Sequence, residues 1–322
     1  MFGAVHLLGP QRPSPNLARV LGVIAPGKPV VTITAGWRHE EGDDDALRRD
    51  IGHQGQSLPL YRWFEELERA EPELFAAYRD RQEEILRIKR IYRIRLDAGI
   101  LAASSLAEEH RKRPDETVAE ELELAYAALR ELRDRFVSRC DAVRQRFLAE
   151  WQPHEREIVR RKRDQAEQLL LSARAICIAG GHVGVLLNRM EFFGLAKVLR
   201  DAIEHGSHVV AWSGGAMAIT DKVVLFHDDA AAGQPHAEVF DRGLGVADRI
   251  VALPHARERL RLDDPARVGL FANRFWPATC VGLEHGAWLV QRDGTWVNRG
   301  PRESAFTLEK DGTIRPLEVV DA

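Results

Sequence analysis

The sequence predicts a three-layer α/β fold with a mainly parallel sheet. A long α-helical insertion interrupts this domain. Short apolar runs ending in Gly- or Pro-rich turns occur near both ends of the chain. Strand and helix patterns alternate after residue 173, which is typical of parallel sheets with right-handed crossovers. Between these regions, glycine nearly vanishes and apolar residues recur at helical spacing. We therefore expect one α/β domain from residues 1–58 and 173–322, with an inserted helical hairpin or bundle over 59–172.

The first 58 residues predict two strands with a helix between them. The apolar runs Gly3–Leu8 and Pro29–Ala35 indicate the strands, and Asn16–Ile24 indicates the helix. The next segment, Gly36–Ser57, is polar and has little apolar periodicity. It is predicted as a loop at the carboxyl end of a strand, which is where open α/β sheets bind their ligands.

The middle of the chain predicts three or four long helices. Gly99 is the only glycine between Leu58 and Ser172, and Pro114 and Pro153 mark two breaks. Apolar residues step by three or four positions along the second half of this region, namely Leu129, Leu132, Phe136, Cys140, Val143 and Phe147. An antiparallel hairpin or small bundle follows from this spacing.

The rest of the chain predicts alternating strands and helices, followed by small antiparallel strands. A helix is expected over Met190–His205. The expected strands are Ala173–Ala179, Ser207–Trp212, Lys222–Phe226 and Val246–Leu253, then Cys280–Leu283, Ala287–Val290, Thr295–Val297 and Ser304–Leu308.

Bulk composition favours a soluble cytoplasmic protein. The formal net charge of -3 gives no overall attraction to nucleic acid or membranes, and no apolar run is long enough to span a membrane. Cys140, Cys177 and Cys280 lie far apart, which argues against a disulfide framework or a zinc site and fits a reducing compartment. The first residues lack the basic start of a signal peptide.

Ser213 is the candidate nucleophile. It lies where the apolar run ending at Trp212 meets Gly214, Gly215 and Ala216, and small residues there permit a sharp strand-to-helix turn. Such a turn exposes the serine at the amino end of the next helix, and the following backbone N–H faces a developing oxyanion. Taken alone, the pattern is more typical of a helix-capping serine.

Gly180 and Gly181 end the preceding predicted strand. In a parallel sheet this turn lies at the same edge as Ser213, so a glycine amide there suits the second oxyanion donor. A tight turn that requires positive φ explains the glycine pair equally well.

A serine nucleophile needs a base, and the base needs an orienting acid. His255 follows the apolar run that ends at Pro254 and is the candidate base, although a capping or surface histidine is the simpler alternative. Asp228, fifteen residues after Ser213, is the candidate acid, and Asp229 is nearly equal to it.

These motifs together resemble peptidase family S51, which has a class I glutamine amidotransferase-like fold and includes peptidase E and the cyanophycinases. The resemblance rests on the glycine pair after a strand, the sequence around Ser213, the acid fifteen residues later, the Pro254-His255 pair and the turn at Val281–Trp288. It covers residues 173–322 and more loosely 1–58. Three features depart from the family pattern: Gly214 replaces the usual alanine, His182 replaces Asn or Asp, and the helical insertion is additional.

The resemblance implies a catalytic triad of Ser213, His255 and Asp228. It also implies an oxyanion hole formed by Gly181 and Gly214. Further substrate contacts are expected at Gly180, His182, Trp212 and Glu284. Glutaminase chemistry, as in the related amidotransferases, is not favoured, because a serine replaces their cysteine and Arg257 replaces their glutamate. No cofactor is predicted.

Two charged regions of the sequence suggest other roles. The cluster His39, Glu40, Glu41, Asp43, Asp44 and Asp45 lacks the spacing of a calcium loop, so a solvated acidic loop is favoured over a metal site. With Arg38, these acids are also suited to contact a charged substrate end. Arginines and lysines near residues 87–95 and 156–163 alternate with glutamates, which favours a solvated face over a nucleic-acid surface, and heptad-like stripes suit a homodimer.

The sequence therefore predicts a serine hydrolase that cleaves a small peptide or specialised amide through an acyl-enzyme. Two alternatives stay open. One is a scaffold whose serine is idle and whose helical insertion recruits a partner. The other is an acyl transferase or esterase that acts on a dedicated metabolite.

Overall fold

A seven-stranded sheet forms the centre of the computed structural model, which describes residues 3–52, 55–226, 237–292 and 294–319. Its strand order is β11-β10-β1-β5-β4-β2-β3, and the strands from β1 to β3 in this order are parallel. The strand bounds are Val5–Leu8 (β1), Val30–Ile33 (β2), Gly55–Ser57 (β3), Ala175–Ile178 (β4), His208–Trp212 (β5), Trp288–Arg292 (β10) and Thr295–Asn298 (β11).

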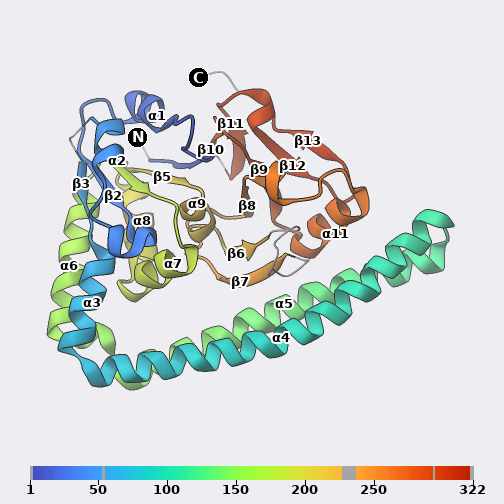
Figure 1. Cartoon of the computed structure of the whole chain (residues 1–322), viewed down its shortest axis with the longest axis horizontal. Helices are drawn as coiled ribbons and strands as arrows, with labels where there is room; N and C mark the ends of the chain where they lie inside the picture. Colours follow the sequence, from blue (N-terminus) through green and yellow to red (C-terminus); the bar gives the residue numbers. More distant parts are fainter. Residues whose placement is uncertain (1–2, 53–54, 227–236, 293, 320–322) are drawn as a thin grey trace.

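Helices cover both faces of this sheet, so the predicted three-layer architecture is confirmed (Figure 1). Alternate residues of β5 pack into two separate clusters: Val209 and Ala211 on one face, Val210 and Trp212 on the other. The first face is covered by α3, α6, α7, α8 and α9 (Leu60–Ala70, Glu157–Ser172, Val183–Phe192, Leu195–Glu204 and Gly214–Ala218). The second is covered by α1 and α2 (Leu17–Ile24 and Asp45–Asp50).

A smaller sheet lies beside the main one and carries the strand that precedes His255. Its order is β13-β12-β9-β8, with β8 and β9 parallel, and a separate ribbon pairs β6 with β7. Helices α10 and α11 follow β8. The bounds are Lys222–Leu225 (β6), Glu238–Arg242 (β7), Ile250–Pro254 (β8), Ala256–Arg259 (α10), Pro265–Phe275 (α11), Thr279–Leu283 (β9), Ala305–Leu308 (β12) and Ile314–Pro316 (β13).

Two predicted elements are wrong in detail. The helix predicted over Met190–His205 is two helices, α7 and α8, which separate at Gly194 because that residue adopts φ 71°. The segment predicted as a loop over Gly36–Ser57 contains the 3-10 helix η1 (Ala35–Glu40), α2 and the edge strand β3. A polar three-residue edge strand gives no hydrophobic signal, which explains why it was not predicted.

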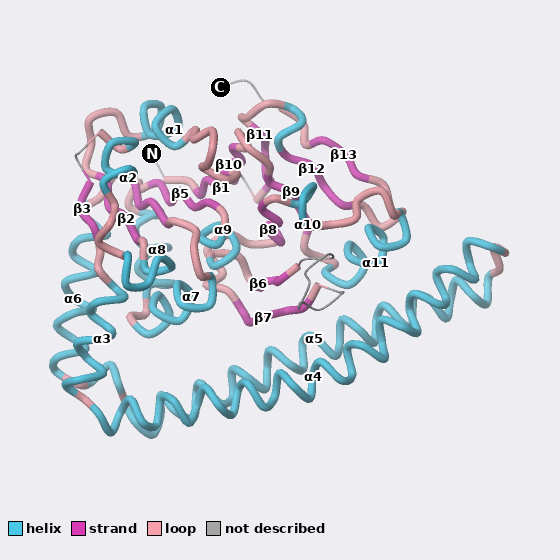
Figure 2. The backbone as a smooth tube through the Cα atoms, viewed as in Figure 1, coloured by secondary structure: helices cyan, strands magenta, loops and turns pink. Residues whose placement is uncertain are grey.

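The inserted region contains four helices in the described chain, two of them very long. Helices α4 (Pro72–Lys112) and α5 (Glu116–Trp151) form an antiparallel hairpin, with the predicted breaks near Pro114 and Pro153. Figures 1 and 2 show this hairpin running beside β7 and α11 and projecting beyond them at its far end. Whether residues 59–172 form a unit of their own stays a prediction.

Ion pairs hold the hairpin against β7. Glu238 of β7 is 7% exposed and accepts two hydrogen bonds of 2.8 Å from Arg93 Nη2, while Lys89 Nζ lies 3.5 Å away. Arg144 of α5 is also buried and pairs with Asp241 of the same strand. Lys89 and Arg93, which belong to the basic region near residues 87–95, therefore neutralise a buried acid.

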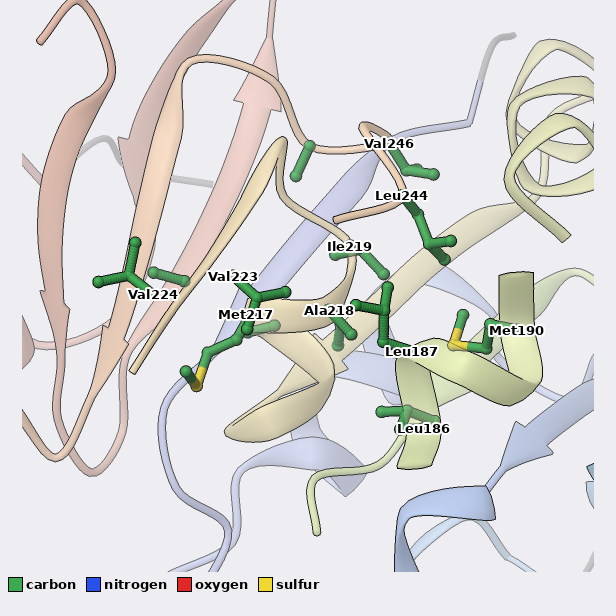
Figure 3. Packing of buried hydrophobic residues seen from close by; sticks show 14 of the residues in the cluster. Leu186, Leu187, Met190, Met217, Ala218, Ile219, Val223, Val224, Leu244 and Val246 are labelled. Carbon is green, nitrogen blue, oxygen red and sulfur yellow. The ribbon is translucent and has the colours of Figure 1, made fainter. Parts of the chain in front are cut away.

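The helix that follows Ser213 is anchored in the core. Figure 3 shows Ala218 and Ile219, at the end of α9, beside Leu187 of α7. Gly215 of α9 lies so close to β4 that an added Cβ would be 2.3 Å from the carbonyl oxygen of Ile178. The turn carrying Ser213 is thus fixed between two strands and a helix.

Cys140, Cys177 and Cys280 are free and buried. In the part of the chain that the structure describes, no helix combines the length and apolarity needed to cross a membrane.

Candidate active site

Ser213 and the Gly180-Gly181 turn lie together at the carboxyl edge of the main sheet. Strands β4 and β5 are parallel neighbours, with Ile178 opposite Ala211, so the residues that follow them leave the sheet at the same edge. A Cβ built on Gly180 would lie 2.6 Å from the Cβ of Ser213. Glycine is therefore required at position 180 by close approach to the serine.

Ser213 has the backbone conformation of a strained strand-to-helix turn. Its φ of 49° and ψ of −125° are rare for a residue with a side chain. It occupies the N-cap position of α9, but its side chain makes no capping hydrogen bond. The capping alternative is thereby removed, and the hydroxyl group is left available for chemistry.

The amides of Gly181 and Gly214 lie next to each other beside the serine. Gly181 adopts φ 134°, and a Cβ on Gly214 would lie 3.0 Å from the carbonyl oxygen of Gly181 and 3.4 Å from its nitrogen. The hydrogen bond from His182 N to the Gly36 carbonyl oxygen, 2.8 Å long, fixes this turn. Among the described residues, neither glycine amide donates to a protein acceptor, so both are available to an oxyanion.

His255 reaches the same site from the smaller sheet. It follows β8 directly, adopts φ 58°, and donates its backbone N–H to the carbonyl oxygen of Leu283 over 3.1 Å. Ser213 and His255 both line one cavity, and within the described chain no hydrogen bond joins them. In unliganded hydrolases such contacts are often long and tighten when substrate binds.

The electrostatic surroundings keep His255 neutral at neutral pH. Burial lowers the pKa of this imidazole below its usual value, and Arg259 and His285 act in the same direction. Glu258 and Glu284 oppose them. A neutral imidazole is the form that accepts a proton from a serine hydroxyl group.

Glu258 and Glu284 are the carboxylates of the described chain that act on the charge of His255. Asp228 and Asp229, the sequence candidates, lie outside the described residues. Glu258 Oε2 is 3.6 Å from His255 Nδ1, but this side chain is 79% exposed. Glu284, predicted as a substrate contact, accepts a hydrogen bond from Arg257 N at 2.9 Å through its Oε1.

The cavity in front of Ser213 has a volume of about 710 Å³. Gly180, Gly181 and Trp212 line it, whereas His182 caps α7 by accepting from Val185 N and is not among the lining residues. Part of the remaining lining comes from the polar segment expected at this edge, namely Trp37, Glu40, Asp43, Ala46, Leu47 and Asp50. No role is predicted from the sequence for the rest of it, which is Pro10, Gln11, Arg12, Pro13, Pro15 and Leu17.

The acidic cluster of the sequence divides into residues with different roles. Glu41 is 1% exposed and accepts from Tyr61 N and Arg62 N at the start of α3, and burial raises the pKa of its carboxyl group. Asp44 pairs with Arg48 over 2.6 Å. Glu40 and Asp43 line the cavity. The described residues include no group of three or more His, Cys, Asp or Glu side chains placed to hold a metal ion.

Comparison with known proteins assigns the family. The model of peptidase family S51 matches residues 124–297, more than half of the chain. A solved peptidase from an acI-B1 Actinobacterium is 15% identical, with a TM-score of 0.51, and the match covers 100% of this chain and 95% of that one. A candidate peptidase E protein from Listeria monocytogenes EGD-e is 9% identical, with a TM-score of 0.46, over 94% of this chain and 100% of that one. No curated protein matches the chain. The chain belongs to peptidase family S51.

Proposed function

We propose that this chain is a serine-type peptidase or amidohydrolase that cleaves a small peptide or specialised amide. Family membership supports hydrolysis as the class of reaction. The observation that carries the proposal is the conformation of Ser213: a strained N-cap residue whose hydroxyl group makes no capping bond and which lines a cavity shared with His255.

The proposed reaction proceeds through an acyl-enzyme. Ser213 Oγ attacks the substrate carbonyl carbon while His255 accepts its proton, and the oxyanion binds the N–H groups of Gly181 and Gly214. The tetrahedral intermediate then expels the amine, which takes the proton from His255. Water, deprotonated by His255, then attacks the ester carbonyl; the C–O bond to Ser213 breaks, Ser213 Oγ takes the proton from His255, and the carboxylic acid product leaves.

Asp228 is the proposed orienting acid, with Asp229 as its alternative. Glu284 and Glu258 are the described carboxylates that raise the pKa of His255. Four single variants, with the carboxylate replaced by its amide at each position, separate these candidates. Loss of the orienting acid lowers kcat by about four orders of magnitude, as a misplaced imidazole does in other triads.

The lining of the cavity supports a substrate with a positively charged group near the scissile bond. Glu40, Asp43 and Asp50 line it, and Arg12 is the arginine on the same wall. Carboxylates at a partly enclosed site attract an ammonium or guanidinium group. A free peptide amino terminus is the simplest such group, so we expect short peptides with unblocked amino termini to be preferred.

A dipeptide-library screen tests this function. The library includes Asp-Xaa, β-aspartyl and Lys- or Arg-containing members, each with a free and an acetylated amino terminus. Wild-type protein is expected to release amino acids from a subset with free termini, and Ser213→Ala is expected to release none. Equal turnover by both proteins would rule out Ser213 as the nucleophile.

The scaffold alternative also has support, because the hairpin projects from the α/β body and no described hydrogen bond joins Ser213 to His255. A folded wild-type protein that cleaves no library member and reacts with no serine-directed probe would favour it. Cleavage of esters with no cleavage of amides would favour the esterase or acyl transferase.

We also propose a cytoplasmic location. The three cysteines are unpaired and fully enclosed, which suits a reducing compartment. Cell fractionation with compartment markers tests this, and recovery with secreted or membrane fractions would contradict it.

A further inference from the structure

The outer face of α4 carries an exposed apolar stripe with no partner in the described chain. The buried residues of this helix face α5 and the α/β body. On the opposite side, Ile94 is 72% exposed and Leu101 69%, and Ile91 is 48% exposed. Large apolar side chains this exposed, grouped on one face of one helix, indicate an interaction surface.

The stripe has the spacing of a coiled-coil seam. Ile91, Ile94, Ala98 and Leu101 follow one another at intervals of three, four and three residues. A 3-4 repeat places side chains along a single line of a helix, where they interlock with those of a neighbouring helix. At about 1.5 Å per residue, the face from Glu83 to Lys112 is about 45 Å long. A second helix of similar length therefore fits it.

Charged residues at the two ends of the stripe indicate that the helix packed against it is α4 of a second copy of this chain. Glu83 and Arg87 precede the apolar residues, and Glu108 and Lys112 follow them; all four are exposed. If two α4 helices pack antiparallel about a two-fold axis between Asp97 and Ala98, each residue faces the residue of the other copy for which the two numbers sum to 195. This arrangement places Arg87 against Glu108 of the partner subunit and Glu83 against Lys112 of the partner subunit. The same axis places Ile94 against Leu101 of the partner subunit.

A parallel arrangement has the opposite electrostatic effect. It would place each arginine, lysine and glutamate against the same residue of the other copy, and like charges at facing positions are destabilising. These four charged residues are thus complementary to those of a second copy only in the antiparallel orientation.

We propose that α4 forms an antiparallel homodimer contact through this stripe, with a second copy of this chain as the partner. The inference is independent of the proposed catalytic function, since it uses no residue of the candidate active site. The seam has few apolar side chains, so we expect a reversible dimer with a dissociation constant in the micromolar range, about 1–100 µM. Glu108 already pairs with Lys112 in the same helix at 2.7 Å, but both side chains are exposed and such a pair contributes little.

Sedimentation velocity of the full-length protein over a concentration series tests the contact. Wild type is expected to pass from monomer to dimer, while Ile94→Glu and Leu101→Glu stay monomeric with unchanged unfolding curves. Leu124→Glu is the matched control, because Leu124 is 63% exposed on α5, away from the stripe, and this variant should dimerise like wild type. A wild type that is monomeric at about 0.5 mM, or a dimer that persists in Ile94→Glu, overturns the proposal.

Charge reversal tests the orientation. Arg87→Glu and Glu108→Arg should each weaken dimerisation about tenfold, and the double variant should restore it, because the reversed charges pair again across the two-fold axis. Failure of the double variant to recover overturns the antiparallel register.

Cysteine cross-linking gives an independent readout. Mixing Ile94→Cys with Leu101→Cys should give a disulfide heterodimer under mild oxidation, in excess of the homodimers of either variant. The native cysteines are buried and should not interfere. Predominant homodimers of each variant would point to a parallel contact and would overturn the proposal.

Discussion

A buried histidine, His6 of β1, which is hydrogen-bonded to the half-buried His208 of β5, predicts a specific loss of stability in mild acid. Trp288 Nε1 donates to His6 Nδ1 over 3.1 Å, so the proton of His6 is on Nε2, which donates to His208 Nδ1 over 3.0 Å. Burial, together with the nearby His208, Arg299 and Arg292, lowers the pKa of His6 from 6.5 to about 3. His208 shifts in the same direction, to about 4, through burial and Arg174.

Because folding lowers the pKa of His6, acidification destabilises the native protein. Below pH 6.5 the unfolded chain binds a proton at position 6, and the native protein does not bind it until about pH 3. Stability from this group is therefore complete above pH 6.5 and falls with acidification by about 1.4 kcal/mol per pH unit. Between pH 7 and pH 5 the loss from His6 alone is about 2 kcal/mol.

Urea unfolding at pH 7, 6 and 5 measures this loss. In His6→Asn an amide offers one acceptor and one donor without titrating, so the fall in the free energy of unfolding over this range should be about 2 kcal/mol smaller than in wild type. His39→Asn is the control for replacement of a histidine, because the His39 side chain is 80% exposed. A His6→Asn curve parallel to that of wild type would refute the assignment of a buried neutral histidine.

Three further predictions concern the site and the hairpin. Gly180→Ala should lower kcat/KM by about 100-fold with little change in substrate binding, because the new methyl group would displace Ser213; steady-state kinetics measure this. The acid limb of kcat/KM against pH should have an apparent pKa below the usual histidine value, since burial lowers the pKa of His255, and a midpoint above 7 would contradict this. Glu238→Gln should lower the free energy of unfolding by about 2 kcal/mol, because two cations on α4 lose their buried partner; an unchanged urea midpoint would argue that these ion pairs do not hold the hairpin.

The sequence predicts the centre of the sheet well for a physical reason. Strands such as Val30–Ile33 and Ala175–Ile178 are buried on both faces, so they are continuous apolar runs between turn residues. The edge strand Gly55–Ser57 is polar and half-exposed, and it pairs only through its backbone with β2. The break between α7 and α8 depends on Gly194 in a left-handed conformation, which a single glycine in a helical pattern does not specify.

Some features of the candidate site also follow from the sequence, whereas others depend on tertiary contacts. Ser213 and the Gly180-Gly181 turn follow consecutive strands of the sheet, so their proximity follows from parallel topology. The segment from Pro10 to Leu17 also lines the cavity with Ser213, but this depends on contacts between distant parts of the chain, for which local sequence contains no signal. The contact of Glu284 with the backbone after His255 is of the same long-range kind.

Covalent labelling of Ser213 tests the central claim most directly. The protein is treated with a fluorophosphonate probe, and the intact mass and the modified peptide are determined for wild type, Ser213→Ala and His255→Ala. The account predicts one adduct per chain on Ser213 in wild type, none in Ser213→Ala, and labelling slowed by at least about 100-fold in His255→Ala, because the base is lost. A folded wild type that acquires no adduct, or an adduct that persists in Ser213→Ala, would contradict it.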